Sequence, residues 1–210
     1  ASAPDVILFT GDMVNLSPDE LDPFVNVLSR LNAPDGVFSI MGNHDYLGYA
    51  HYDSPGEQEA QERRLMGMER SAGMDLLLNE NRIIRHGRDS IALVGVENDG
   101  RPPFPERGDL TKAQAGLPSG IFKVLMSHDP THWRRKVLPD TDIDLTLSGH
   151  THAMQFRIGN FSPSMFLYHE WGGLYSEGER RLFVSTGTGG NIAYRWGAWP
   201  EIDVLVLRRK

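Results

Sequence analysis

The sequence predicts an α/β fold in which buried strands deliver polar side chains to one edge of a sheet. Four apolar runs each lead directly into Asp, Asn or His, and they occupy residues 6–12, 37–46, 123–129 and 145–152. A helical pattern separates the first two runs, and such a strand–helix–strand unit has parallel strands. Because open α/β sheets keep their chemistry at the strand ends, the four runs predict one shared site.

The length and composition of the chain fit a single domain over residues 1–210. With 210 residues the chain can bury a sizeable core, and its formal net charge is −7. That charge argues against nonspecific binding of nucleic acid, which needs Lys and Arg to neutralise phosphates. The absence of Cys excludes a disulfide framework, a zinc-thiolate site and a thiol nucleophile. No apolar run approaches the roughly 18 residues of a membrane span, so we expect a soluble domain as given, in an unknown compartment.

Cap and turn residues predict the helices. The sequence Ser17-Pro18-Asp19-Glu20 is a capping box with proline at the first helical position. We expect the helix that it opens to bury one apolar face, made of Leu21, Phe24, Val25, Leu28 and Leu31. A second helix is expected from Ser54 to Ala72, with Gly73 as its stop. Asp109 is expected to cap a short helix that runs through Leu117.

The remaining segments predict strands and one long loop. Residues 83–84 and 91–96 are expected to pair as a hairpin, and residues 182–186 and 202–207 to form closing strands. The aromatic segment 161–178 is expected to be a loop that packs on the core. A second hypothesis makes it an apolar rim for a lipid or nucleoside part of a substrate. The rim hypothesis fails if Trp171 is fully buried.

The residues at the four strand ends predict a metal site. They are a carboxylate, an amide and two imidazoles, contributed by Asp12, Asn43, His128 and His150. Mixed oxygen and nitrogen ligation suits Mn, Fe or Zn better than Ca or Mg. His152 follows His150 by two residues on a glycine turn, so the pair can address one ion or two adjacent ones. A lone Asp or Asn after a strand is more often a turn residue, and only the set points to a metal.

The same residues resemble the motifs of the calcineurin-like metallophosphoesterase family, in order and spacing. The matching sequences are Gly11-Asp12, Gly42-Asn43-His44-Asp45, Ser127-His128 and Gly149-His150-Thr151-His152. The sequence from Ser127 to Trp133 is similar to a family subgroup that includes bacterial membrane-associated phosphoesterases. The resemblance implies a sandwich of two mixed β-sheets flanked by helices, and a hydrolase that acts on phosphate esters.

The resemblance also implies roles for individual residues. Asp12 would bridge two ions, with Asn43, His128 and His150 on one of them and His152 on the other. Paired ions polarise phosphoryl oxygens and activate water for attack. His44, oriented by Asp45, would stabilise charge on phosphorus or protonate the leaving oxygen. The implied substrate is a small phosphodiester or pyrophosphate, such as a nucleotide-linked lipid.

The sequence departs from the family pattern at its beginning. The pattern opens with Asp-x-His on a strand before Val6, and nothing before Asp12 matches it. We expect that strand to be missing from an N-terminally truncated piece, so that this fragment binds one ion and the complete site binds two. Membrane association through a missing upstream segment is a further expectation. The alternative is a catalytically impaired scaffold that binds a phosphorylated ligand or a protein partner.

Overall fold

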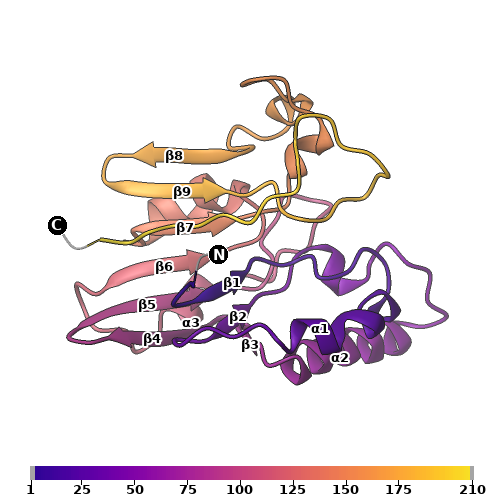
Figure 1. The fold of residues 1–210 in the computed structure, drawn as a ribbon, viewed down its shortest axis with the longest axis horizontal. Helices are drawn as coiled ribbons and strands as arrows, with labels where there is room; N and C mark the ends of the chain where they lie inside the picture. Colours follow the sequence, from indigo (N-terminus) through magenta and orange to yellow (C-terminus); the bar gives the residue numbers. More distant parts are fainter. Residues whose placement is uncertain (1–2, 209–210) are drawn as a thin grey trace.

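Two β-sheets pack face to face in the computed structural model, which describes residues 3–208 (Figure 1). The smaller sheet is parallel, with the order β1 (Ile7–Phe9), β2 (Val37–Ser39), β3 (Asp75–Leu76). The larger sheet has the order β4-β5-β6-β7-β9-β8 and comprises β4 (Glu80–His86), β5 (Asp89–Gly95), β6 (Phe122–Met126), β7 (Leu145–Ser148), β8 (Gly173–Glu177) and β9 (Arg180–Val184). Only the larger sheet is mixed, because β4 and β8 pair antiparallel at its edges. The predicted α/β sandwich is confirmed, with one of its sheets wholly parallel among the described residues.

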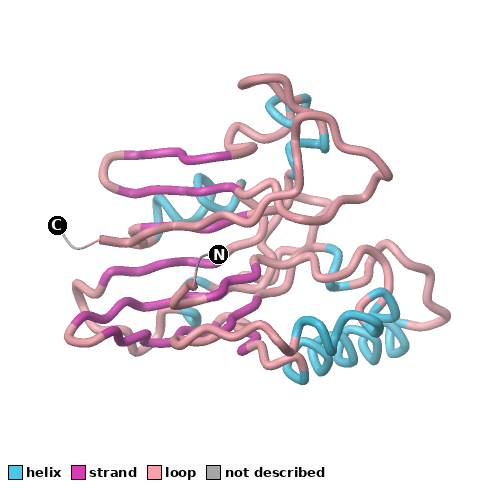
Figure 2. Tube along the Cα trace, viewed as in Figure 1, coloured by secondary structure: helices cyan, strands magenta, loops and turns pink. Residues whose placement is uncertain are grey.

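The core of the sandwich lies between the two sheets. Phe38, Ile40 and Leu77 from the smaller sheet and its strand ends pack against Leu93 and Met126 of the larger one. Helix α2 (Pro55–Ser71) lies beside the smaller sheet in Figure 2, and its Met66 packs against the apolar cluster that contains Leu76 of β3. Burial along most of their length explains why the parallel strands β2, β6 and β7 read as short continuous apolar runs, whereas β1 is half-buried.

The segment between β1 and β2 is helical only in short pieces. The predicted capping box at Ser17 is present, but it opens a 3₁₀ turn, η1 (Pro18–Glu20). A second turn, η2 (Asp22–Phe24), and one α-helical turn, α1 (Val25–Leu28), follow. Pro23 explains the interruption, because proline lacks the N–H that a continuous helix needs. Phe24 and Leu31, predicted to be buried, are 56% and 41% exposed, so that part of the prediction is wrong.

The other predicted helices are present with altered lengths. Ser54 caps α2, and Gly73 follows it at φ 85°, a conformation that suits a helix stop. Asp109 caps α3 (Leu110–Ala113), which ends four residues earlier than expected. A π-helical turn, η4 (Trp133–Val137), leads into α4 (Leu138–Asp140). Together with α3 these turns cover the outer face of the larger sheet.

Two predictions in the C-terminal third are wrong. Segment 161–178 is not entirely a loop, because it contains the turn η6 (Pro163–Phe166) and the edge strand β8. Residues 202–207, predicted as a closing strand, belong to no sheet, and Ile202 is 85% exposed. An apolar, β-branched run forms a strand only where a sheet edge is there to pair with it. Among residues 3–208, no helix is long and apolar enough to cross a membrane.

Candidate metal centre

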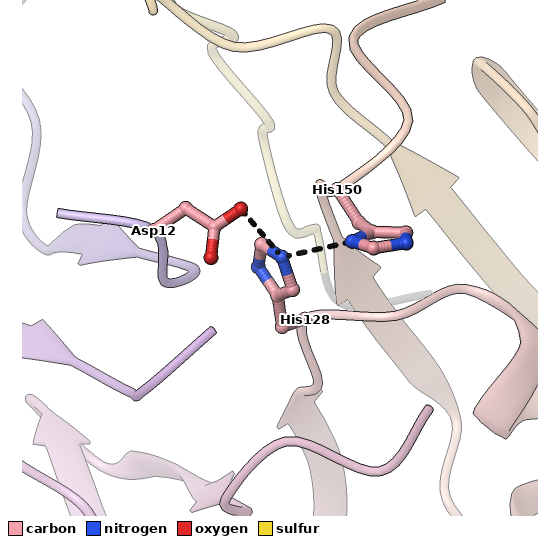
Figure 3. Close-up of side chains that lie close together, drawn as sticks. All are labelled: Asp12, His128 and His150. Carbon is pink, nitrogen blue, oxygen red and sulfur yellow. Dashed lines mark hydrogen bonds and ion pairs between the residues drawn. The ribbon is translucent and has the colours of Figure 1, made fainter. Parts of the chain in front are cut away.

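The sheets bring the two halves of the predicted site together at the carboxyl ends of their strands. Asp12 and Asn43 follow β1 and β2 of the smaller sheet, whereas His128 and His150 follow β6 and β7 of the larger one. Figure 3 shows Asp12, His128 and His150 pointing toward one another from these different strands. The convergence that the sequence predicted therefore takes place across the sandwich, and not along a single sheet edge.

Neighbouring donor atoms of the site lie within hydrogen-bond distance. His128 Nε2 is 3.0 Å from Asp12 Oδ2 and 3.1 Å from Asn43 Oδ1. His150 Nδ1 is 2.7 Å from Asn43 Oδ1 and 3.2 Å from His128 Nε2. Ligands about 2.0–2.2 Å from a zinc ion in tetrahedral geometry are separated by roughly 3.4 Å. Four donors this close, with two nitrogens among them, fit a transition-metal dication.

Backbone contacts allow Asp12 and His128 to approach each other. A Cβ added to Gly42 would overlap Asp12 and would lie 2.8 Å from His128 Cε1. A Cβ added to Gly11 would lie 2.7 Å from Gly42 Cα, so the two glycine backbones are in contact. Gly11 also has φ 94°, where side chains are disfavoured. The glycines of the two motifs thus make room for the ligands.

Asp45 organises the loop that carries Asp12. Its carboxylate is fully buried and accepts N–H bonds from Gly42, Asp12 and Met13 at 2.7–2.8 Å and from Val14 at 3.3 Å. Burial and the charge of Asp12 raise the pKa of Asp45 to about 7, although these N–H bonds act in the opposite direction. The prediction that Asp45 orients His44 is wrong, because both of its oxygens are engaged by backbone donors. Asp45 instead positions Asp12.

His44 lies beside the cluster and faces outward. It begins the turn η3 (His44–Tyr46), and its Nδ1 is 2.8 Å from the Asn15 carbonyl. Its Nε2 is 3.3 Å from Asn191 Nδ2. The ring packs against Tyr49, with centroids 4.4 Å apart. His44 therefore has one nitrogen held by the chain and the other directed toward a polar amide.

Both cluster histidines are oriented through their second nitrogen. His128 Nδ1 is 2.7 Å from the Thr10 carbonyl, which accepts its N–H and leaves Nε2 facing the cluster. His150 Nε2 is 2.8 Å from Tyr168 Oη and 3.8 Å from Asp129 Oδ2. Such partners fix the orientation of a ligating imidazole.

His152 lies outside the cluster formed by Asp12, His128 and His150, whose donor atoms are all within 4.8 Å of one another. It begins the turn η5 (His152–Gln155), and its Nδ1 is 3.3 Å from the Thr186 carbonyl. All four residues of η5 have φ between 46° and 56°, and His150 has φ 70°. A left-handed backbone costs roughly 1–2 kcal/mol per non-glycine residue, so other contacts must hold this turn. Gln155 supplies three of them, to the N–H of Ile192 and to the carbonyls of Ile192 and Tyr194.

Burial and neighbouring charges shift the pKa values of Asp12, His128 and His150. Burial alone would raise the pKa of Asp12, but the charge and hydrogen bond of His128 hold it well below its usual range. Burial lowers the pKa of His128, but the Asp12 carboxylate outweighs it and raises that pKa to about 9. Burial and the charge of His128 lower the pKa of His150 to about 4, so its Nδ1 offers a lone pair. A dication competes with the His128 proton for these atoms.

The structure adds contributors that the sequence analysis missed. They are the phenols of Tyr49 and Tyr168, the side chain of Asn191 and the carbonyl of Thr10. Tyr49 accepts a 2.7 Å hydrogen bond from Asn43 Nδ2, which turns the amide oxygen toward the histidines. Tyr168 belongs to the predicted aromatic loop, where several other polar residues, such as His169 and Glu170, accompany it in the sequence. No periodicity or motif marks Asn191 or a backbone carbonyl.

This arrangement defines a class of protein: an α/β sandwich with a mixed Asp, Asn and His cation site at its strand ends. A model of the calcineurin-like phosphoesterase family matches residues 1–154. The chain belongs to the calcineurin-like phosphoesterase family.

Several relatives share this similarity over almost the whole chain. The Bacillus subtilis metallophosphoesterase YkuE is 30% identical, over 99% of this chain and 69% of its own length. The Escherichia coli phosphodiesterase YaeI is 28% identical, over 97% of this chain and 70% of its own length. An uncharacterised Campylobacter jejuni metallophosphoesterase is 29% identical, over 99% of this chain and 52% of its own length. The chain thus spans about half to seven tenths of the length of these relatives.

The fold itself also occurs in a solved structure. The Thermus thermophilus sulfate thiohydrolase SoxB aligns with a TM-score of 0.51 over 85% of this chain and 33% of its own, at 21% identity. At this identity the similarity supports the sandwich fold.

Proposed function

We propose that this chain is the catalytic domain of a metal-dependent hydrolase that cleaves a phosphodiester or pyrophosphate bond in a small-molecule substrate. The observation that carries the proposal is the convergence of Asp12, Asn43, His128 and His150 donor atoms within 2.7–3.2 Å of their neighbours. A relative named as a phosphodiesterase supports the diester. When bound, a Mn, Fe or Zn ion polarises the phosphoryl group and lowers the pKa of water.

Residues of the chain would bind the cation, position its ligands and contact the leaving group. Asp12, Asn43, His128 and His150 bind the cation, and Asp45 holds the Asp12 loop in place. His44 faces the substrate side, where it can protonate the leaving oxygen or stabilise charge on phosphorus. The Asn191 amide lies 3.3 Å from His44 Nε2 and is positioned to bind the same leaving oxygen.

We further propose that His152 contributes to a second ion beside Asp12. His152 is half-buried, and burial lowers its pKa. The charge of Asp12 acts in the opposite direction, so the two side chains interact electrostatically. Within residues 3–208, β1 is an edge strand, and its free edge can accept the Asp-x-His strand of the family pattern. On this proposal the 210-residue chain binds one ion, and a protein extended by that strand binds two.

The proposal is tested by metal content and turnover together. We expect the chain extended by the Asp-x-His strand, loaded with Mn, to hydrolyse bis-p-nitrophenyl phosphate. His128→Gln should lower kcat at least about a hundredfold and reduce bound Mn, because it removes a ligand. His86→Gln is the matched control, since His86 is 75% exposed on the β4–β5 hairpin. One bound ion or none, with no hydrolysis under any metal, would favour the alternative, a scaffold that binds a phosphorylated ligand or a protein.

A further inference from the structure

Exposed apolar side chains gather beside the metal centre. We define the aromatic lobe as residues 154–168 and 189–200. Within residues 3–208, ten large apolar residues of the lobe are between 38% and 76% exposed: Met154, Ile158, Phe161, Met165, Phe166, Leu167, Ile192, Tyr194, Trp196 and Trp199. Scattered exposed apolar residues are ordinary, but a contiguous set marks an interaction surface.

The two segments of the aromatic lobe form one unit. Gln155 binds the backbone of Ile192 and Tyr194, and the N–H of Arg157 donates to the Trp196 carbonyl at 2.7 Å. The rings of Phe161 and Phe166 lie 6.2 Å apart. In Figure 1 the orange and yellow segments lie together beyond the ends of β7 and β9. The exposed side chains therefore belong to a single projecting region.

The lobe borders the metal centre on two sides. Asn191 approaches His44 to 3.3 Å, and Tyr168 approaches His150 to 2.8 Å. Trp171, which follows the lobe, is only half-buried, with the Arg157 guanidinium 5.5 Å from its ring centroid. The rim hypothesis required that Trp171 not be fully buried, and this condition holds. A surface that binds the aromatic lobe would therefore lie next to the metal centre.

Charge distinguishes the lobe from the rest of the chain. Its two charged residues, Arg157 and Arg195, are both basic, and it contains no Asp or Glu. The chain has a formal net charge of −7, so the remainder carries −7 − 2 = −9. Trp and Tyr favour the boundary between water and lipid, and arginines add attraction to anionic headgroups. Its exposed Trp and Tyr side chains and its two arginines therefore both make the aromatic lobe complementary to an anionic lipid surface.

We propose that the aromatic lobe docks this protein on an anionic lipid bilayer and places the metal centre at the lipid surface. Tryptophan, phenylalanine and isoleucine side chains on the turns enter the headgroup region, and Arg157 contacts the lipid phosphates. The inference deepens the proposed function, because it makes a lipid-borne phosphodiester or pyrophosphate the substrate class. Binding to lipid can be measured without turnover, so the docking proposal can be refuted while the proposed hydrolase activity stands, and the reverse.

The test is co-sedimentation of the chain with vesicles, in EDTA, with thermal unfolding of each variant as a folding check. We expect binding to phosphatidylcholine vesicles that contain phosphatidylglycerol, weaker binding to pure phosphatidylcholine, and a blue shift of tryptophan emission. The double variant Trp196→Ser, Trp199→Ser should bind at least about tenfold more weakly. A second pair on the other segment, Phe166→Ser and Leu167→Ser, should do the same and guards against a folding defect in the first.

Matched controls separate the lobe from general surface hydrophobicity. Phe24→Ser with Val27→Ser removes residues that are 56% and 57% exposed in another part of the molecule, and binding should not change. Arg157→Gln should weaken binding about fivefold to anionic vesicles and leave binding to neutral ones unchanged. No binding to anionic vesicles, or equal losses for lobe and control variants, would overturn the proposal.

Discussion

At the scale of single residues, Asp45 serves the site without facing it. A buried carboxylate that accepts four backbone N–H bonds fixes the turn that carries Asp12 and the turn that carries Asn43. The motif position alone suggests a partner for the neighbouring histidine. In the structure the Asn15 carbonyl contacts His44 Nδ1, because the Asp45 side chain points back into the loop.

Replacing Asp45 by Asn should therefore lower the stability of the metal-free protein. The amide would turn an NH₂ group toward backbone donors and leave buried N–H groups unpaired, at a cost of roughly 1–3 kcal/mol for each group. Because burial and the charge of Asp12 raise the pKa of Asp45 to about 7, removal of its charge offsets part of this loss at pH 8. Urea denaturation at pH 8 measures the free energy of unfolding. Asp109→Asn makes the same chemical change at a helix cap that tolerates either residue, so it should be nearly neutral. Equal effects of the two substitutions would contradict this role.

Tyr168 gives a second prediction at the residue scale. Its phenol accepts the His150 Nε2–H, and Tyr168→Phe removes that acceptor while keeping the ring. We expect the Mn dissociation constant, measured by calorimetry, to rise about tenfold. Tyr194→Phe is the control, because Tyr194 is 64% exposed on the aromatic lobe. An unchanged dissociation constant for Tyr168→Phe would show that Asp129 or water orients His150 equally well.

At the scale of elements, α2 carries a buried carboxyl group. Glu69 is 1% exposed, and neither of its carboxylate oxygens has a hydrogen-bond partner among the described residues. Burial raises its pKa to about 8, and the charge of Asp45 adds to the shift. Glu69 is therefore protonated in the folded protein at pH values where it is ionised in the unfolded chain.

This difference predicts that stability falls as pH rises. Between the unfolded pKa of 4.5 and the folded value of about 8, the native state binds more protons, so the free energy of unfolding decreases with pH. At about 1.4 kcal/mol per pKa unit the loss is on the order of several kcal/mol. Glu69→Gln should remove it and raise the melting temperature at pH 8 more than at pH 5. Glu59→Gln, on the exposed side of the same helix, should change neither value.

At the scale of the whole molecule, the proposed ion ties the two sheets together. Asp12 and Asn43 follow strands of one sheet, and His128 and His150 follow strands of the other. Such a cation binds the folded chain and loses its site on unfolding. It therefore links metal concentration directly to the stability of the sandwich.

Mn at a hundred times its dissociation constant should stabilise the chain by about 2.7 kcal/mol. For a domain of this size that corresponds to a rise in melting temperature of roughly 5–10 °C. Asn43→Ala should abolish most of the rise, whereas Asn160→Ala, at an exposed turn, should preserve it. A melting temperature that does not respond to Mn would contradict the assignment of these four ligands.

Local signals were enough to place most elements. The capping residues Ser17, Ser54 and Asp109 each cap a helical segment, because their side chains bond N–H groups only a few residues away. Segment 202–207 shows the limit of such signals, since its apolar, β-branched composition is that of a strand but no sheet edge among the described residues pairs with it. Strand formation depends on a partner that is distant in sequence.

The sequence by itself determined which residue types stand at the four strand ends, because residue type and apolar patterning are local properties. The tertiary structure alone decided which of those residues meet. It placed Asn43 Oδ1 between His128 and His150, left His152 outside the cluster, and turned Asp45 toward the backbone. It also exposed the aromatic lobe beside His44. These outcomes depend on how two sheets pack and on contacts between residues up to 147 positions apart, and no local pattern encodes such distances.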